Sequence, residues 1–230
     1  GPEFANRRID LVYNGVPAGS AGPDQREQAR ARVRRTVGAW LGEPVDWLFT
    51  HVTRLVRSKA LWRDLLVLEQ LDAELARRGE RAVLLVLATD AGPRTAADVE
   101  RMAGDYGWPV AHCEGWPDLT PGELAFDLQV RRLNARARAV RVLFVNQFGF
   151  DRRSCGPALA DDVSFADLRA GTDAEFGQSM YEPFGIAMLE PVGAGAVCVV
   201  SDVCGCLGFA GRVLAGRLHP GLVVGAYTSL

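Results

Sequence analysis

The sequence predicts an α/β protein with a doubly wound, Rossmann-like parallel sheet and helices on both faces. Two observations predict this fold class. Short, uninterrupted apolar runs recur along the chain, as is typical of strands buried on both faces. Amphipathic helical patterns separate these runs, and such strand–helix alternation favours a parallel sheet. With 230 residues, 48% of them hydrophobic, the chain is large enough to build one domain of this kind.

The apolar runs define the predicted strands. Four are strong, at Val45–Val52, Ala82–Ala88, Val140–Val145 and Ala196–Ser201. Two further candidates are Ile9–Tyr13 and Leu222–Tyr227. Ligands of open parallel sheets bind at the carboxyl ends of the strands, so the functional residues are expected just after these runs.

The helices between the strands have recognisable boundaries. Leucines recur at helical spacing from Leu61 to Leu75, and Gly79 is placed to end that helix. The run Thr120-Pro121-Gly122-Glu123 combines an N-cap, a proline at the first helical position and a capping glutamate. The stretch from Gln147 to Ala174 has no clear period, so we expect a long loop or a small insertion there.

Composition excludes several classes of protein. The formal net charge is −2 with both signs dispersed, so the chain lacks the basic stripe of a nucleic-acid-binding protein. No apolar run approaches the roughly 20 residues of a transmembrane segment. The five cysteines have no paired spacing, which predicts free thiols in a reducing, cytoplasmic compartment rather than disulfides. Cys204-Gly205-Cys206 is too tightly spaced for a zinc knuckle, so no metal is expected.

The opening residues have a different character from the rest. Gly1-Pro2-Glu3-Phe4 resembles a protease remnant followed by a cloning scar, and we leave it out of the fold. Residues 5–230 are expected to form a single domain.

Two glutamates near the C-terminal third form the most distinctive pattern, E-P-F-G-x-x-x-L-E from Glu182 to Glu190. In a helix that starts at Pro183, they would lie roughly on one side and ~12 Å apart along the axis. That exceeds the ~5–9.5 Å of a glycosidase carboxylate pair and suits the two ends of one extended ligand. The amides of the next residues would line the helix N-terminus, where an anionic or hydroxyl-rich group can bind: Phe184, Gly185 and Ile186.

A pair of cations follows the strand that ends at Val52. Arg54 and Lys59 would frame the turn after it, and a forked guanidinium with a compact ammonium suits a diphosphate. Lys59 is the only lysine of the chain, whose other basic residues outside histidine are all arginine. Arg57 is expected to face water.

Together these motifs resemble the C-terminal domain of GT-B-fold retaining glycosyltransferases, the group that includes glycogen and sucrose-phosphate synthases. Asn14-Gly15 resembles the family's N-G-V/I entry segment, and Arg54-Leu55-x3-Lys59 resembles its R-L-x3-K-G motif, with Ala60 in place of the glycine. Glu182 through Glu190 resembles its E-x7-E motif. The chain departs from the family at Pro191, which should shorten the helix, and at the loop after Ser201.

The resemblance implies a hexosyltransferase that uses a nucleotide-diphosphate sugar and retains the anomeric configuration. Arg54 and Lys59 would hold the donor diphosphate and stabilise the leaving group. Glu182 would bind the donor sugar together with Phe184, Gly185 and Ile186, and Glu190 would bind the ribose. Neither a cofactor, a metal nor a protein nucleophile is implied. Asn14 and Gly15 would contact the donor.

The family also implies a second, N-terminal domain that carries the acceptor site and is the partner of this one. Alone, the present domain is expected to bind donor and to transfer slowly or not at all. Two alternatives remain open from the sequence: a GT-B-fold epimerase or phosphorylase, and a catalytically silent sugar-nucleotide-binding module. The sequence disfavours an NAD-dependent oxidoreductase, because Gly193-Ala194-Gly195 precedes a strand instead of following one. A P-loop NTPase is disfavoured by the absence of G-x4-G-K-[ST].

Overall fold

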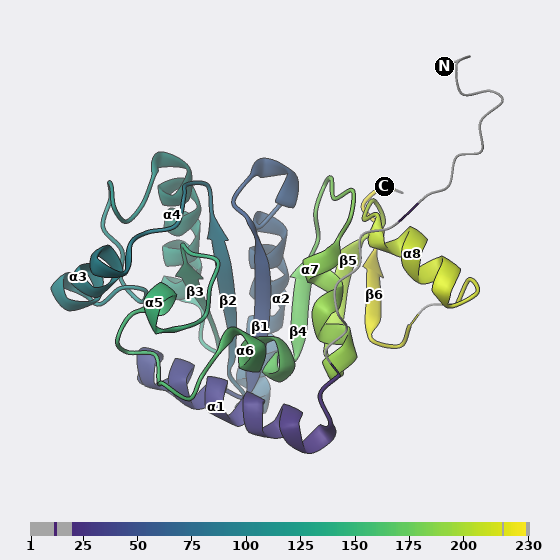
Figure 1. Cartoon of the computed structure of the whole chain (residues 1–230), viewed down its shortest axis with the longest axis horizontal. Coiled ribbons are helices and arrows are strands. Elements are labelled where there is room, and N and C mark those ends of the chain that lie inside the picture. The colour runs from purple at the N-terminus through teal and green to yellow at the C-terminus, as the bar shows by residue number, and fades with distance from the viewer. Residues whose placement is uncertain (1–11, 13–19, 218, 229–230) are drawn as a thin grey trace, which may run out of the picture.

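A computed structural model describes residues 12, 20–217 and 219–228 of the chain. Six strands form one parallel sheet in the order β3-β2-β1-β4-β5-β6 (Figure 1). From β1 the chain winds outward to β3, then returns to the other side of β1 and winds outward to β6. This order defines a doubly wound, Rossmann-like sheet, so the predicted fold class is confirmed.

The strands are β1 (Trp47–Arg54), β2 (Ala82–Thr89), β3 (Val140–Val145), β4 (Ala174–Gly177), β5 (Val197–Ser201) and β6 (Leu222–Gly225). Five of them lie where the apolar runs predicted them, within two residues at each boundary. The exception is β4, which the sequence analysis missed. The predicted strand Ile9–Tyr13 lies outside the described residues except for Val12, which belongs to no helix or strand.

The helices are α1 (Pro23–Leu41), α2 (Trp62–Arg78), α3 (Ala96–Tyr106), α4 (Pro121–Arg136), α5 (Arg152–Cys155), α6 (Phe165–Gly171), α7 (Ile186–Leu189) and α8 (Cys206–Val213). The described residues also contain two 3-10 turns, η2 (Arg57–Lys59) and η3 (Glu190–Ala194). Gly79 ends α2 in the left-handed conformation, and Thr120 and Glu123 form the predicted capping box of α4. The expected insertion at 147–174 contains the short helices α5 and α6.

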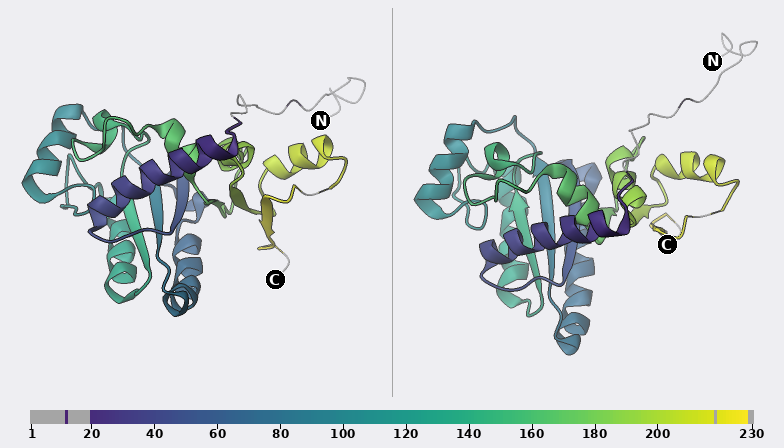
Figure 2. Two further views of the ribbon diagram at one scale, coloured as in Figure 1. Left: turned by 90° about the horizontal axis from the view of Figure 1, so that it is seen from below. Right: turned by 60° about the horizontal axis from the view of Figure 1, so that its bottom comes forward.

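Helices cover both faces of the sheet. The apolar sides of α2 and α4 pack on one face, and α1, α3, α5 and α6 contribute to the opposite core. Figure 2 shows α1, in purple, and α2, in blue, on opposite sides of the strands. Neighbouring residues of β2 divide between the two cores: Leu84 packs towards α2 and Leu85 towards α1. Burial of each such leucine stabilises the fold by about 2 kcal/mol.

Candidate functional site at the switch point of the sheet

The order of the strands creates one position where the two loops that follow neighbouring strands turn away in opposite directions. That position lies between β1 and β4. After β1 the chain continues to β2 and β3 on one side, whereas after β4 it continues to β5 and β6 on the other side. Open α/β sheets bind ligands in the crevice beyond such a switch point. The site is therefore sought in the segments after Arg54 and after Gly177.

The segment after β1 is a tight turn that withdraws Lys59 from solvent. After Arg54, which is exposed, the chain forms η2, and Ala60 ends it with a left-handed backbone at φ 53°. A glycine adopts this conformation without steric cost, which gives a physical reason for the glycine of the motif that Ala60 replaces. Lys59 is only 9% exposed, whereas Arg57 is exposed as predicted.

The segment after β4 is hydrogen-bonded to that turn. The amides of Met180 and Tyr181 both donate to the Ser58 carbonyl, at 2.8 and 3.2 Å. The Arg63 guanidinium, at the start of α2, donates to the Gln178 carbonyl at 2.8 Å. These bonds fix the two loops against each other, so the side chains that follow are held by backbone contacts on both sides of the switch point.

Lys59 and Glu182 meet across this junction as an ion pair, the Lys59 Nζ donating to Glu182 Oε2. The other carboxylate oxygen accepts hydrogen bonds from the amides of Phe184 and Gly185, each at 3.1 Å. Burial opposes ionisation of Glu182, but the ammonium and the two amides hold its pKa below the ordinary value. We call Lys59, Glu182, Phe184 and Gly185 the switch-point cluster. Within this cluster the carboxylate of Glu182 is held ionised by the ammonium and the two amides.

The predicted start of a helix at Pro183 is wrong. Gly185 adopts φ 74° and its amide caps the Glu182 side chain, so helical geometry begins only at Ile186. The helix α7 has four residues and passes into η3 at Glu190. Pro191 lies in the first turn of η3, which agrees with the prediction that this proline shortens the helix.

Gly185 is needed at its position for a second reason. A Cβ there would lie 2.4 Å from Cys204 Sγ, closer than real contacts allow. The atom nearest to the Cβ position of this glycine is therefore a cysteine sulfur.

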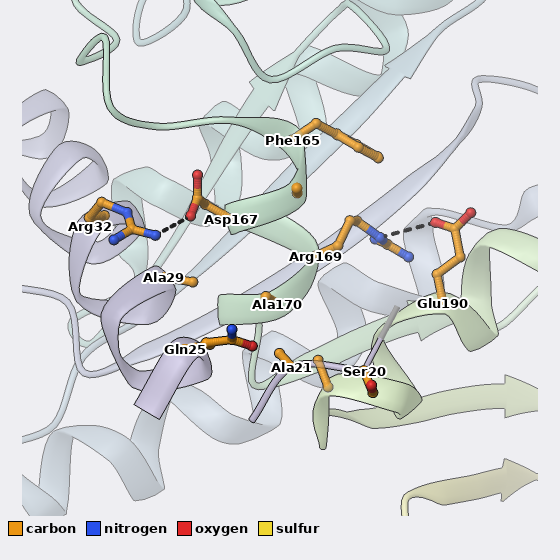
Figure 3. Close-up of a pocket in the computed structure, with 12 residues that line it drawn as sticks. Ser20, Ala21, Gln25, Ala29, Arg32, Phe165, Asp167, Arg169, Ala170 and Glu190 are labelled. Carbon is orange, nitrogen blue, oxygen red and sulfur yellow. Dashed lines mark hydrogen bonds and ion pairs between the residues drawn. The ribbon is translucent and has the colours of Figure 1, made fainter. Parts of the chain in front are cut away.

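Glu190 has a different partner from Glu182. Its Oε2 lies 3.2 Å from Nε of Arg169 on α6, and Arg169 also donates to the buried Glu175 carboxylate at 2.8 Å. Figure 3 shows Arg169 and Glu190 pointing towards each other at the wall of a cavity. This cavity has a volume of about 620 Å³ and is lined by residues of α1, α6 and η3, and by Ser20 and Ala21. Neither Lys59 nor Glu182 lines it, so the two glutamates of the motif face different environments.

Among the described residues, Arg54, Ile186 and Glu190 make no hydrogen bond or ion pair with the side chains of the switch-point cluster. Arg54 stays exposed at the end of β1, and Ile186 is half-buried at the start of α7. Asn14 and Gly15 lie outside the described residues. The structure thus brings together Lys59, Glu182, Phe184 and Gly185 and leaves Arg54 and Glu190 apart from them.

Beneath the cluster lies a polar network that the sequence analysis did not identify. The buried Asp64 carboxylate contacts His51 Nδ1 at 2.6 Å and accepts from the Gln178 side chain at 2.9 Å. Tyr227, after β6, donates to that same Gln178, and the Arg63 guanidinium stacks 3.9 Å from the Tyr227 ring centroid. Tyr227 is the last residue of the predicted strand Leu222–Tyr227, whereas Gln178 follows β4, which was not predicted, so no sequence signal pointed to Gln178.

Two features are absent from the described residues. Within that part of the chain, no three His, Cys, Asp or Glu side chains gather in a way that could hold a metal ion. Every helix there is too short or too polar to span a bilayer.

Comparisons with known proteins complete the description. No protein-family model and no curated protein sequence matches this chain. Among solved structures it is similar to a UDP-forming α,α-trehalose-phosphate synthase from Burkholderia vietnamiensis, with 16% identity, a TM-score of 0.48, and coverage of 84% of this chain and 38% of that one. For the enzyme from Burkholderia multivorans the identity is 18% and the TM-score 0.49, with coverage of 88% of this chain and 37% of that one. For the enzyme from Burkholderia xenovorans in complex with glucose-6-phosphate the identity is 16% and the TM-score 0.49, with coverage of 91% of this chain and 39% of that one. The chain thus spans less than two-fifths of the length of each of these enzymes.

Proposed function

We propose that this chain is the donor-binding half of a retaining glycosyltransferase that uses a nucleotide-diphosphate sugar. The observation that carries the proposal is the ion pair of Lys59 with Glu182, which joins the R-L-x3-K segment to the first glutamate of E-x7-E. Two motifs separated by more than a hundred residues meet at the switch point of the sheet, where ligands of this fold class bind.

Each group of the cluster suits one part of such a donor. The Lys59 ammonium has three donors and one anionic partner, so it can bind a diphosphate oxygen while it keeps Glu182. Glu182 Oε2 has one lone pair left to accept a sugar hydroxyl, because it accepts only from Lys59, whereas Oε1 accepts from two amides. Arg54, exposed five residues before Lys59, supplies a second cation for the leaving diphosphate.

Glu190 requires a different account. Because Arg169 lies against it, Glu190 would bind a ribose hydroxyl through its free oxygen or after exchanging that partner. No metal and no cofactor belongs to the proposal, and no protein nucleophile is assigned. The leaving phosphate would accept the proton of the acceptor, and the acceptor itself would bind to a second, N-terminal domain.

Calorimetric titration tests the proposal. UDP, GDP and ADP, and their glucose and mannose conjugates, are titrated into the wild-type chain, Lys59→Ala, Arg54→Ala and Arg57→Ala. We expect saturable binding of one nucleotide, weakened by about 1–3 kcal/mol in Lys59→Ala because a charge-assisted contact is lost. Arg57, which is exposed in the same turn, is the matched control and should bind like the wild type. Equal affinity of Lys59→Ala and wild type would contradict the proposed site.

Glu182→Gln separates the sugar from the nucleotide. If Glu182 binds sugar hydroxyls, this variant loses affinity for the sugar conjugate and keeps most of its affinity for the nucleotide diphosphate. Loss of both equally would mean that Glu182 serves only to orient Lys59.

A second candidate function is the catalytically silent sugar-nucleotide-binding module, which the same cluster would serve. Release of free sugar from the bound conjugate by a longer form of the protein distinguishes the two, because a silent module leaves the conjugate intact. An epimerase would instead be revealed by a change in the sugar of the recovered conjugate.

A further inference from the structure

Two cysteine sulfurs lie against each other at the start of α8. Cys204 Sγ and Cys206 Sγ are 3.1 Å apart, and both residues are buried, at 3% and 2% exposure. Their backbone is held in a turn, because Cys204 N donates to the Ser201 carbonyl at 3.0 Å and Leu207 N to the Cys204 carbonyl at 3.1 Å. Residues two apart in a helical turn have Cα atoms about 5.4 Å apart, inside the ~4.4–6.8 Å that disulfides span.

We propose that Cys204 and Cys206 form a reversible oxidation site, at which a small hydroperoxide converts the two thiols into a disulfide. Cys204, as thiolate, attacks the peroxide and becomes a sulfenic acid while the peroxide is reduced to an alcohol, or to water from hydrogen peroxide. The Cys206 sulfur then attacks the sulfenic sulfur, the S–S bond forms, and the hydroxyl leaves as water. The thiols lose two electrons and two protons, and the peroxide takes up both.

The surroundings of the pair favour this chemistry over two other uses of cysteine. A shared zinc ion would hold two thiolates about 3.8 Å apart in a tetrahedral site of four ligands. Here the sulfurs are closer, and the described residues contain no third His, Cys, Asp or Glu at the site. The third neighbour is the thioether of Met188, 3.7 Å from Cys204 Sγ. The second alternative is that the two cysteines are inert thiols of the core. Against this, the hydrogen bond from Cys206 lowers the pKa of Cys204, which favours the reactive thiolate.

The cover over the sulfurs determines which oxidant fits. Gly185 lies directly on them, since a Cβ there would be 2.4 Å from Cys204 Sγ and 3.1 Å from Cys206 Sγ. Phe184, the next residue in this cover, is 53% exposed. A small hydroperoxide should therefore pass this cover more readily than a bulky disulfide reagent.

The same contacts couple the oxidation site to the switch-point cluster. Gly205 N donates to the Glu182 carbonyl at 2.8 Å, and the Gly185 amide donates to the Glu182 carboxylate. Formation of the S–S bond draws the sulfurs from 3.1 Å to about 2.05 Å and contracts the surface on which Gly185 lies. Oxidation should therefore loosen the hydrogen bonds that the amides of Phe184 and Gly185 make with Glu182.

Peptide mapping after treatment with hydrogen peroxide tests the site. Trypsin releases residues 170–212 as one peptide, which also contains Cys198 and so provides an internal control. In the wild type we expect the mass of this peptide to fall by that of two hydrogen atoms, and only one of its three cysteines to be alkylated. Dithiothreitol should restore both the original mass and the alkylation of all three cysteines. Cys198→Ala should form the same disulfide, and Cys204→Ala and Cys206→Ala should form none. Oxidation of the exposed Cys113 shows that the peroxide treatment has worked. If all three cysteines of the peptide 170–212 can then still be alkylated, the proposal is overturned. A disulfide that includes Cys198 would also overturn it.

Hydrogen exchange tests the coupling without any nucleotide. The amides of residues 184 and 185 should exchange several-fold faster in the oxidised wild type than in the reduced protein, and return to the slow rate on reduction. Peroxide-treated Cys206→Ala, which cannot form the bond, controls for other oxidation. A disulfide that leaves these exchange rates unchanged would refute the coupling while the modification site stands.

Discussion

The Lys59 ammonium and the Glu182 carboxylate contact each other although they lie 123 positions apart in the sequence. Their side chains are only 11% and 13% exposed. Two charges this far removed from water depend on each other, because loss of one leaves the other without compensation. The pair therefore links the two halves of the sheet at the switch point and keeps the candidate site charged before any ligand binds.

The acid dependence of stability should reveal the Glu182 pair. The folded pKa of Glu182 lies below its unfolded value, so its stabilisation is present above the unfolded pKa of about 4.3 and is lost as the pH falls through the folded pKa. At pH 6, Glu182→Gln should lower the free energy of unfolding by about 1–2 kcal/mol. Below the folded pKa the two proteins should converge. Urea unfolding between pH 3 and 7 measures both curves.

Glu74 offers a matched control for that measurement. Arg77 and Arg78 lower the pKa of Glu74 to about 2, but this carboxylate lies on the outer surface of α2 in water. Solvent screening makes such a pair contribute little. Glu74→Gln should therefore follow the wild-type curve much more closely than Glu182→Gln, and a larger effect at Glu74 would contradict our view of the switch-point pair.

The sequence was sufficient for the strands whose residues are apolar throughout and insufficient for β4. This strand reads Ala174-Glu175-Phe176-Gly177, and the glutamate breaks the apolar run. Glu175 is nevertheless fully buried, since it accepts from Val52 N at 3.1 Å and from Arg169 at 2.8 Å. These partners lie far from it or on another element, so a local pattern cannot anticipate them.

The site was predictable to a similar extent. Motif spacing identified Lys59 and Glu182, but the rule of carboxyl strand ends applied only to Lys59, because β4, the strand before Glu182, was not predicted. It could not show that Glu182 uses its own following amides, because the left-handed Gly185 is a tertiary choice that makes room for Cys204. Nor could it show that Glu190 meets Arg169, which depends on how α6 packs.

The buried pair of His51 and Asp64 should give the opposite pH dependence. Burial disfavours a charged ring, yet the Asp64 carboxylate raises the pKa of His51 above its ordinary value. The resulting stabilisation is full below the unfolded pKa of about 6.5 and is lost as the pH rises through the folded pKa. Asp64→Asn should cost about 3 kcal/mol near pH 6, where an unpaired buried charge would remain, and less at pH 9. Chemical unfolding at both pH values tests this, and a constant difference between wild type and variant would contradict it.

Arg94 should be the most sensitive arginine of the fold. Its guanidinium is fully buried with Glu123, and it donates to the side chain of Thr89 at 2.7 Å and to the carbonyl of Asn146 at 2.8 Å. It thereby holds together the carboxyl ends of β2 and β3. Arg94→Met should destabilise the protein by about 3–5 kcal/mol, because the Glu123 charge stays buried without its partner. Arg101→Met, at an exposed position of α3, should change stability by less than about 0.5 kcal/mol in the same thermal unfolding experiment.

Two glycines around α8 should respond oppositely to alanine. At Gly205 an added Cβ would lie 1.8 Å from the Pro183 carbonyl oxygen, and that carbonyl belongs to the segment that positions Glu182. At Gly211, inside the same helix, an added Cβ meets nothing within 4 Å. Gly211→Ala should therefore stabilise the protein by about 0.5–1 kcal/mol, the gain expected for alanine in a helix. Gly205→Ala should destabilise it by at least ~2 kcal/mol, since the backbone at Pro183 has to move. Thermal unfolding compares the variants, and faster hydrogen exchange at residues 184 and 185 in Gly205→Ala alone would locate the disturbance. Equal effects of the two substitutions would contradict the close packing of Gly205 against Pro183.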